Sequence, residues 1–342
     1  MDKVHVVSEK ELVSGIRAAQ KKYQVAALTQ KQEKVLYDVI GENDPILLTS
    51  APTVLSPKKF FFPQQEVILE YSGDGKTVTP VVESHPMVLL GLRPCDLNGL
   101  KILDEAFADS NGDPNYLEKR EKAIIIGLDC ASVCDEEAFC YKVNAHQVKS
   151  GVDIMLSPQE KGFLVTLLTI KGQEFATAYL NLTPSDPALL AQFKKDKDAN
   201  FAKSGDQFKN LDSLPEIYEK NKNHIVWEEE GAKCLSCGSC IMVCPTCYCF
   251  DVADELALSL QKGERIRRWD ACMLSSFAEV HGGENFRGKA VARLKHRINR
   301  KFNYLMRKHG QSACVGCGRC VRACLVDISP KVITEVLTEE KG

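Results

Sequence analysis

Long hydrophobic runs are the first feature that this sequence lacks. Of its 342 residues 44% are hydrophobic, but the longest apolar stretches, such as those at 87–92 and 123–128, are short. A membrane span needs roughly 20 consecutive apolar residues. The sequence also starts without an apolar stretch of the signal-peptide kind and ends without a prenylation box. We therefore expect a cytoplasmic protein with no membrane span.

Excess charge and the common nucleotide-binding motifs are missing as well. A formal net charge of −2 gives no general attraction to nucleic acid or to anionic membranes. Neither G-x-G-x-x-G nor G-x-x-x-x-G-K-[ST] occurs, so neither a standard dinucleotide fold nor a P-loop is indicated. No pair of histidines has the H-x-x-x-H spacing. We therefore expect no catalytic residues, and the chain shows no obvious place to make or break substrate bonds.

Cysteine, by contrast, is abundant. The chain has 15 cysteines, an odd number that fits poorly with a fully paired set of disulfides. In a reducing compartment disulfides are rare, and clustered thiols usually bind metal or carry redox chemistry. Metal binding is therefore the first hypothesis.

Two twelve-residue segments repeat one spacing of cysteines: CLSCGSCIMVCP at 234–245 and CVGCGRCVRACL at 314–325. In C-x2-C-x2-C-x3-C runs of bacterial ferredoxins, three thiolates ligate one 4Fe–4S cluster and the fourth ligates the other. Zinc ribbons instead use two C-x2-C pairs separated by a longer loop. The repeat favours clusters over buried structural thiols. The predicted ligands are Cys234, Cys237, Cys240 and Cys324 for the first cluster, and Cys314, Cys317, Cys320 and Cys244 for the second.

The segment between the two runs, 250–310, is predicted to be a helical insertion, because apolar residues recur at helical spacing in 254–269 and 283–310. The second stretch also has a cationic face. Three interpretations of this face stay open: a solvated helix surface, a docking surface for an acidic partner, and cations placed beside electronegative clusters. Nucleic acid is less favoured, because aromatic residues are not interleaved. The cations are Arg287, Lys289, Arg293, Lys295, Arg297, Arg300, Lys301, Arg307 and Lys308.

The first part of the chain has a different pattern. Short apolar runs suited to strands alternate with segments suited to helices, which predicts an α/β domain with a partly parallel sheet over 1–180. A polar, lysine-rich stretch at 181–225 is predicted to be a helical connector. Residues 226–342 are predicted to form a mostly α-helical, ferredoxin-like dicluster domain. The predicted strands are 46–50, 67–71, 87–92, 123–128 and 163–170.

The predicted α/β domain carries cysteines of its own: Cys95 after the strand at 87–92, and Cys130, Cys134 and Cys140 after the strand at 123–128. Adjacent parallel strands bring their carboxyl ends to one edge, so we expect these loops to meet. Two interpretations stay open: a third 4Fe–4S cluster, distant from the ferredoxin-like domain, and separate buried thiols.

Cys247, Cys249 and Cys272 complete the set of cysteines. Either they pack beside the clusters as small polarizable residues, or they act as ligands or sulfur-binding thiols. The sequence favours packing without excluding the other roles.

Several segments together resemble one family: SPKKFFFPQQE, LRPCDLNGLKILDEAF, CPTCYCFDV, RRWDACM and GGENFR. The chain is similar to the iron–sulfur subunit shared by cytoplasmic nickel–iron sulfhydrogenases and anaerobic sulfite reductases. Near Cys140 the family usually has C-F-C, of which Phe139-Cys140 remains. The resemblance implies a hetero-oligomer with a flavin subunit that binds NAD(P)H and a catalytic subunit of the hydrogenase or sulfite reductase kind.

These observations favour an electron-transfer subunit that relays electrons through two 4Fe–4S clusters, with a possible third. One alternative is an iron–sulfur enzyme with its own substrate site beside the Cys95 loop. Another is an iron–sulfur regulator that binds nucleic acid through the basic face.

Overall fold

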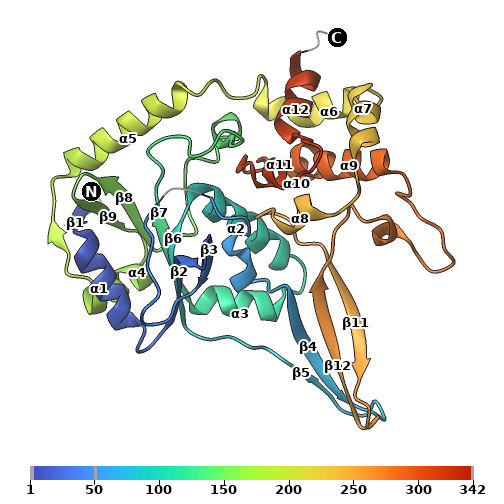
Figure 1. Cartoon of the computed structure of the whole chain (residues 1–342), viewed down its shortest axis with the longest axis horizontal. Coiled ribbons are helices and arrows are strands. Elements are labelled where there is room, and N and C mark those ends of the chain that lie inside the picture. Colours follow the sequence, from blue (N-terminus) through green and yellow to red (C-terminus); the bar gives the residue numbers. More distant parts are fainter. Residues whose placement is uncertain (1–3, 50–51, 340–342) are drawn as a thin grey trace.

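A mixed eight-stranded sheet forms the first part of the molecule (Figure 1), in a computed structural model that describes residues 4–49 and 52–339. The strand order is β10-β1-β9-β8-β7-β6-β2-β3. The pairs β2–β6, β6–β7 and β7–β8 are parallel, and the other pairs are antiparallel. The strands are β1 (Val4–Val7), β2 (Gln24–Lys31), β3 (Lys34–Val39), β6 (Met87–Leu92), β7 (Ala123–Leu128), β8 (Ile154–Gln159), β9 (Gly162–Leu167) and β10 (Thr183–Pro184).

Helices cover both faces of this sheet, which explains why β6 and β7 are apolar along their whole length. Successive residues of a strand point to opposite faces. Thus Val88 packs in one core cluster with α1 (Glu9–Ala19) and α4 (Ile170–Tyr179), and Leu89 packs in another. The second cluster contains α2 (Pro94–Phe107) and α3 (Pro114–Lys122). The predicted α/β region with a partly parallel sheet is confirmed.

One predicted strand, 46–50, is wrong over its described residues 46–49, which form no strand; Ser50 lies outside the described residues. The neighbouring strand β2 pairs with β6 only over residues 24–26. Beyond that stretch Leu47 donates a backbone hydrogen bond of 2.8 Å to Leu28, but a single bond of this kind does not make a ladder.

A second, antiparallel sheet of four strands projects from the body of the molecule (Figure 1) in the order β11-β12-β4-β5. The predicted helix at 254–269, and with it the helical insertion over 250–269, is wrong, because this segment forms the hairpin β11–β12. Strand β12 pairs along its length with β4, which lies almost 200 residues earlier, and this pairing overrides the local helical pattern. The strands are β4 (Gln65–Ser72), β5 (Val78–Pro80), β11 (Phe250–Leu256) and β12 (Lys262–Trp269).

The remaining regular elements are helices, separated by irregular segments, and the expected mostly α-helical character of 226–342 is not confirmed. The long helix α5 leads from the sheet towards the C-terminal helices (Figure 1). The helix predicted at 283–310 begins at Ala290 and continues through a π-helical turn to His309. The elements are α5 (Pro187–Ala202), α6 (Leu214–Lys220), α7 (Val226–Lys233), α8 (Ser239–Met242), α9 (Ala290–Asn299), η5 (Arg300–Tyr304), α10 (Leu305–His309), α11 (Arg319–Arg322) and α12 (Pro330–Glu339). Short 3-10 turns are η1 (Pro57–Phe60), η2 (Cys140–Val143), η3 (Leu211–Ser213) and η4 (Ser275–Ala278).

The hydrophobic core of the C-terminal helices includes residues from the first part of the chain. Cys95, which lies in the first turn of α2 and not in the expected loop, packs in the same cluster as Ile298 and Phe302. Phe139, from the loop after β7, belongs to this cluster as well. Loops at the carboxyl edge of the large sheet are therefore directly against the C-terminal helices. Within the described ranges, no helix has the length and apolar character needed to cross a membrane.

Candidate metal centres

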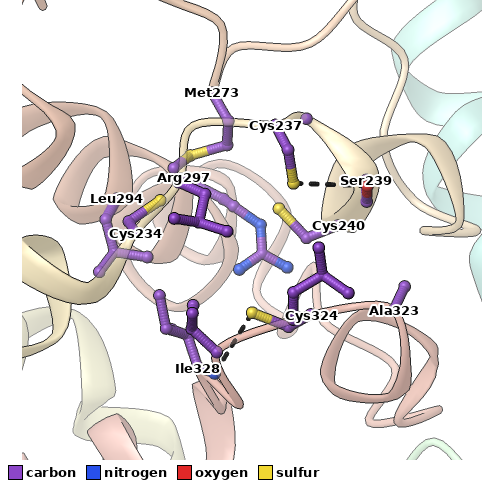
Figure 2. A pocket seen from close by; sticks show the side chains of 14 residues that line it. Cys234, Cys237, Ser239, Cys240, Met273, Leu294, Arg297, Ala323, Cys324 and Ile328 are labelled. Carbon is purple, nitrogen blue, oxygen red and sulfur yellow. Dashed lines mark hydrogen bonds between the residues drawn. The ribbon is translucent and has the colours of Figure 1, made fainter.

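Eight cysteines of the two runs line two pockets in the C-terminal part of the molecule. Each pocket takes three cysteines from one run and the fourth from the other run, which is the grouping that the ferredoxin spacing predicts. Figure 2 shows the first pocket with four of these side chains around it. Ligation of a cluster by these thiols stays a prediction. The first pocket has Cys234, Cys237, Cys240 and Cys324, and the second has Cys244, Cys314, Cys317 and Cys320.

The first cysteine of each run accepts a hydrogen bond from a backbone amide two residues later. Ser236 N lies 3.4 Å from Cys234 Sγ, and Gly316 N lies 3.5 Å from Cys314 Sγ. Both donors have positive φ, 54° and 60° respectively, so the chain turns its amide back towards the sulfur. Backbone donors of this kind stabilise a thiolate and raise the potential of a cluster bound to it.

Glycines complete the turn in both runs. Gly238 and Gly318 have φ of 78° and 72° and stand directly before the short helices α8 and α11. Glycine takes this left-handed conformation without a steric penalty. The two runs therefore fold alike, and the repeat in the sequence is also a repeat in the structure.

The sulfurs of the first pocket have further polar contacts, which Figure 2 marks. The amide of Ile328 donates to Cys324 Sγ at 3.4 Å, and Cys237 Sγ lies 3.4 Å from the hydroxyl of Ser239. This contact with Ser239 lowers the pKa of Cys237, which is the one exposed cysteine among the residues that the structure describes. The first site thus reaches the surface at Cys237.

The donor set is the kind that iron–sulfur clusters use. In the described part of the chain, no three His, Cys, Asp or Glu side chains converge closely enough to hold a single metal ion. The irons of a 4Fe–4S cluster occupy separate corners, so its four ligands approach from separate directions and stay further apart. Soft thiolates without oxygen ligands suit zinc or iron–sulfur clusters, and the spacing of the two runs favours the clusters.

Three cations on the helix after the first run face inward. Arg293, Arg297 and Lys301 stand four residues apart and share one face of α9 and η5. Their relative exposures are 4%, 4% and 5%. For these three residues the solvated-surface interpretation of the basic face is wrong. Arg297 and Lys301 lie beside the thiols, and Arg293 donates to Ser236 Oγ of the first run at 2.7 Å.

Arg297 lines both pockets, and its guanidinium is directed towards the sulfurs in Figure 2. Burial disfavours its charge, but the thiolates of Cys240 and Cys320 outweigh burial and raise the pKa of Arg297. Lys301 is similar, since Cys244 raises its pKa against burial, and its Nζ donates to Thr246 Oγ1 at 2.6 Å. Both side chains stay cationic and offset the negative charge that thiolates bring into the interior.

Lys58 is another buried cation, and no sequence pattern predicted its position. Lys58, in η1, is 3% exposed, and its Nζ donates to the backbone oxygen of Cys247 at 2.9 Å. The same Nζ lies 4.2 Å from the centre of the Trp269 ring. In the sequence, Lys58 could have been noticed because it lies in SPKKFFFPQQE, one of the segments that carry the family resemblance.

Cys95, Cys130 and Cys140 pack at the same hydrophobic cluster, beyond the carboxyl ends of the parallel strands β6 and β7. Cys95 interacts electrostatically with Cys130, and Cys140 interacts with both Cys130 and Cys134. Burial raises the pKa of Cys130 and of Cys140 to about 12 and raises that of Cys95 strongly. Thiols so buried stay protonated unless a metal replaces the proton.

This third group lies directly against the second run, so the expected distance from the ferredoxin-like part is wrong. Phe139 N donates to Gly316 O at 2.7 Å. Arg319, between the cysteines of the second run, makes a buried two-point ion pair with Asp96, at 2.7 and 3.1 Å. The loops of the sheet and the second run therefore form one continuous structure. Cys317 interacts electrostatically with Cys95 and with Cys140.

Asp129, beside Cys130, has a structural role. Its Oδ1 accepts from the amide of Cys130 at 2.8 Å and pairs with Lys197 of α5 at 2.6 Å. The pair fastens the connector helix to the loop that follows β7.

Comparison with known proteins defines the class first. Residues 233–328 match the family model of the 4Fe-4S dicluster domain, so the protein is an iron–sulfur protein of the 4Fe–4S dicluster class. The "Sulfhydrogenase 2 subunit beta" of Pyrococcus furiosus is 33% identical over 313 residues, which cover 88% of each chain. The chain therefore belongs to the iron–sulfur subunit family of the sulfhydrogenase beta subunit, as the resemblance implied. No solved structure matches the chain.

Proposed function

We propose that the protein is a cytoplasmic electron-transfer subunit of a hetero-oligomeric oxidoreductase. Two 4Fe–4S clusters, when bound, take up and release single electrons. The proposed partners are a flavin subunit that binds NAD(P)H and a catalytic subunit of the hydrogenase or sulfite reductase kind. The observation that carries the proposal is the grouping of the two cysteine runs into two mixed sets of four. The name of the relative supports it.

The proposed sites are neighbours in a row. Cys240 of the first site interacts electrostatically with Cys320 of the second, and Arg297 lines both pockets. Cys317 of the second site interacts with Cys95 and Cys140 of the third group. We propose that the third group holds a further 4Fe–4S cluster, which makes the protein a three-site relay with the ferredoxin-type sites at one end.

The first site supplies one proposed contact surface. Leu235 and Leu325, which line the same pocket as Cys237, are 60% and 81% exposed. Exposed apolar side chains next to an exposed ligand suit a protein partner, because docking there excludes water and shortens the path for an electron. The loop after β7 supplies a second proposed contact surface, at the other end of the relay, because residues 131–132 and 136–137 are exposed around Cys134.

The two alternative functions, an iron–sulfur enzyme and a regulator that binds nucleic acid, have less support. Cys95 is buried and Asp96 is engaged by Arg319, so a substrate site beside the Cys95 loop has no free polar group from these residues. The inward direction of Arg293, Arg297 and Lys301 removes much of the basic face that a nucleic-acid regulator would use.

Iron content tests the proposal. The full chain, purified and reconstituted without oxygen, is expected to hold about twelve irons with three clusters. Cys140→Ser is expected to lower the iron content to about eight atoms per chain. Cys317→Ser is expected to lower the iron content through the second site. Cys247→Ser is the matched control and is expected to retain about twelve. Iron near eight in the wild type would remove the third cluster, and iron near four would contradict the dicluster assignment itself.

Electron transfer is tested with the partner present. NAD(P)H is expected to reduce the clusters of the holo chain only after the flavin subunit is added, with reduction followed by the loss of visible absorbance. A holo chain that NAD(P)H reduces equally well alone would contradict the role as a relay.

A further inference from the structure

Three cysteines outside the proposed cluster sites line one further pocket. Cys247, Cys249 and Cys272 lie on its wall, and its volume is about 400 Å³. Cys249 precedes β11 and Cys272 follows β12, so the base of the hairpin brings them together. The amide of Asp270 donates to Cys249 O at 3.0 Å and closes this base. The hairpin that the sequence did not predict is thus the element that forms the pair.

Cys249 and Cys272 are an asymmetric pair. Both line the same pocket, and the Cys249 thiol interacts with the side chain and the backbone of Cys272. The contact with the Cys272 thiol lowers the pKa of Cys249, and the same contact raises the pKa of Cys272. One sulfur is therefore prepared as a thiolate and the other as a thiol, which is the arrangement that thiol–disulfide exchange requires.

Cationic side chains also line this pocket. Arg287, Arg297, Arg300 and Lys301 line the pocket, and burial lowers the pKa of the neighbouring His296 to about 4, so His296 is neutral. Within the described residues, Nε of Arg297 is buried without a hydrogen-bond partner, although the side chain is 4% exposed. The same is true of the buried Nε of Arg287.

Aromatic side chains complete the wall: Tyr248, Phe250 and Phe277. Cations with aromatic surface and adjacent thiols suit a small ligand that carries negative charge and a reactive sulfur. A wall of this composition disfavours cationic ligands.

We propose that this pocket is a dithiol–disulfide site for small anionic disulfides, with Cys249 as the attacking thiolate and Cys272 as the resolving thiol. The Cys249 thiolate attacks one sulfur of the ligand, so a mixed disulfide forms, the ligand's S–S bond breaks and one thiolate leaves. Cys272 loses its proton and attacks the Cys249 sulfur, which forms the Cys249–Cys272 disulfide and releases the second thiolate. Two electrons and one proton then restore the thiolate and the thiol.

This last reduction step rests on the proposed function, because its electrons come one at a time from the ferredoxin-type sites. The geometry suits the transfer. Cys272 interacts electrostatically with Cys240 of the first site, and Cys247 interacts with Cys244 of the second. Arg297 lines this pocket and both cluster pockets.

The exchange step is tested on the full, reconstituted chain without oxygen. The probes are the dianionic disulfide 5,5′-dithiobis(2-nitrobenzoate) and the dicationic disulfide cystamine. Wild type is expected to form the Cys249–Cys272 disulfide and to release two thionitrobenzoates. Cys272→Ser is expected to stop at a mixed disulfide on Cys249, found by peptide mass spectrometry, with one thionitrobenzoate released. Cys249→Ser is expected to leave Cys272 unmodified, and Cys247→Ser, the matched control, to react like wild type.

Charge selection is tested with the same probes. Arg287→Gln is expected to slow the reaction of Cys249 with the dianion roughly tenfold and to leave the slower reaction with cystamine unchanged. Equal rates for the two probes in wild type would overturn the anionic specificity. An unmodified Cys249 would overturn the site, as would the loss of about four irons in Cys249→Ser, because the thiol would then be a cluster ligand.

Coupling to the clusters is tested separately. The Cys249–Cys272 disulfide is prepared with the probe, and the clusters are then reduced by illuminated deazaflavin, with the cluster-free chain as control. We expect the disulfide to be reduced in the holo chain and to survive in the cluster-free chain. If Cys249 is trapped as above but its disulfide survives in the reduced holo chain, the exchange site stands and the coupling to the proposed relay is overturned.

Discussion

Arg297 is expected to control the redox potentials of both ferredoxin-type sites. It is a buried cation that lines both pockets, and its guanidinium points towards the sulfurs (Figure 2). Reduction adds negative charge to a cluster, so a nearby cation favours the reduced state. Arg297→Gln removes this charge with a polar side chain of similar length, and both potentials are expected to fall.

The magnitude follows from Coulomb's law. A unit charge roughly 7 Å from the added electron, at an effective dielectric constant of about 20, contributes about 2.4 kcal/mol. For a one-electron couple, 59 mV corresponds to about 1.4 kcal/mol. The predicted fall is therefore on the order of 100 mV. Arg297→Lys keeps the charge and is expected to shift the potentials by less than about a third of this value.

The assay is a redox titration of the holo chain followed by electron paramagnetic resonance. Arg307→Gln is the matched control, since Arg307 lies on α10 of the same helical segment but is exposed and pairs with Glu216. Its potentials are expected to equal those of wild type. Iron content is measured in parallel, so that a loss of clusters is not mistaken for a shift. Unchanged potentials in Arg297→Gln protein with full iron content would refute the reasoning.

Two other substitutions test the junction between the large sheet and the second run. Gly316→Ala is expected to loosen the junction and lower the iron content, because a Cβ there would lie 2.6 Å from the amide nitrogen of Cys140 at a φ of +60°. Asp96→Ala is expected to lower the free energy of unfolding by about 3–5 kcal/mol, measured by urea titration, because the buried guanidinium of Arg319 loses its partner.

Each of these substitutions has a control. Gly282→Ala has the same kind of positive φ, +98°, with no atom within 4 Å of the new Cβ, so it separates backbone strain from the clash. Equal iron loss in both glycine variants would contradict the role of the junction. Asp254→Ala removes an exposed ion pair with Arg265 and is expected to change stability by less than about 1 kcal/mol. An effect as small as this in Asp96→Ala would show that Arg319 finds another partner or water.

The features predicted well from sequence are those that local spacing encodes. Each run has three cysteines within seven residues and a glycine-dependent turn between the second and the third. The runs fold alike at Cys234 and at Cys314 because each turn is closed by its own backbone amides. The strands β6 and β7 are apolar throughout because both of their faces are buried, so their bounds could be read directly. Parallel strands then explain why Cys95 and Cys130 meet.

The features that were missed depend on partners distant in the sequence. Residues 254–269 have helical spacing of apolar residues, but β4 offers β12 a full ladder of backbone hydrogen bonds. Arg293, Arg297 and Lys301 have the spacing of a solvated helix face, and the same spacing serves a face turned towards thiolates. Nothing local distinguishes the two cases.

The sequence by itself determined the class of protein, because the ligand spacing of a 4Fe–4S dicluster site lies within two short segments. The tertiary structure alone decided what surrounds those segments. It packed the Cys140 loop onto Gly316, buried Arg297 between two pockets, and closed the hairpin that pairs Cys249 with Cys272. The physical reason is that charge compensation and sulfur–sulfur contact act through space, whereas sequence patterns record only neighbours along the chain.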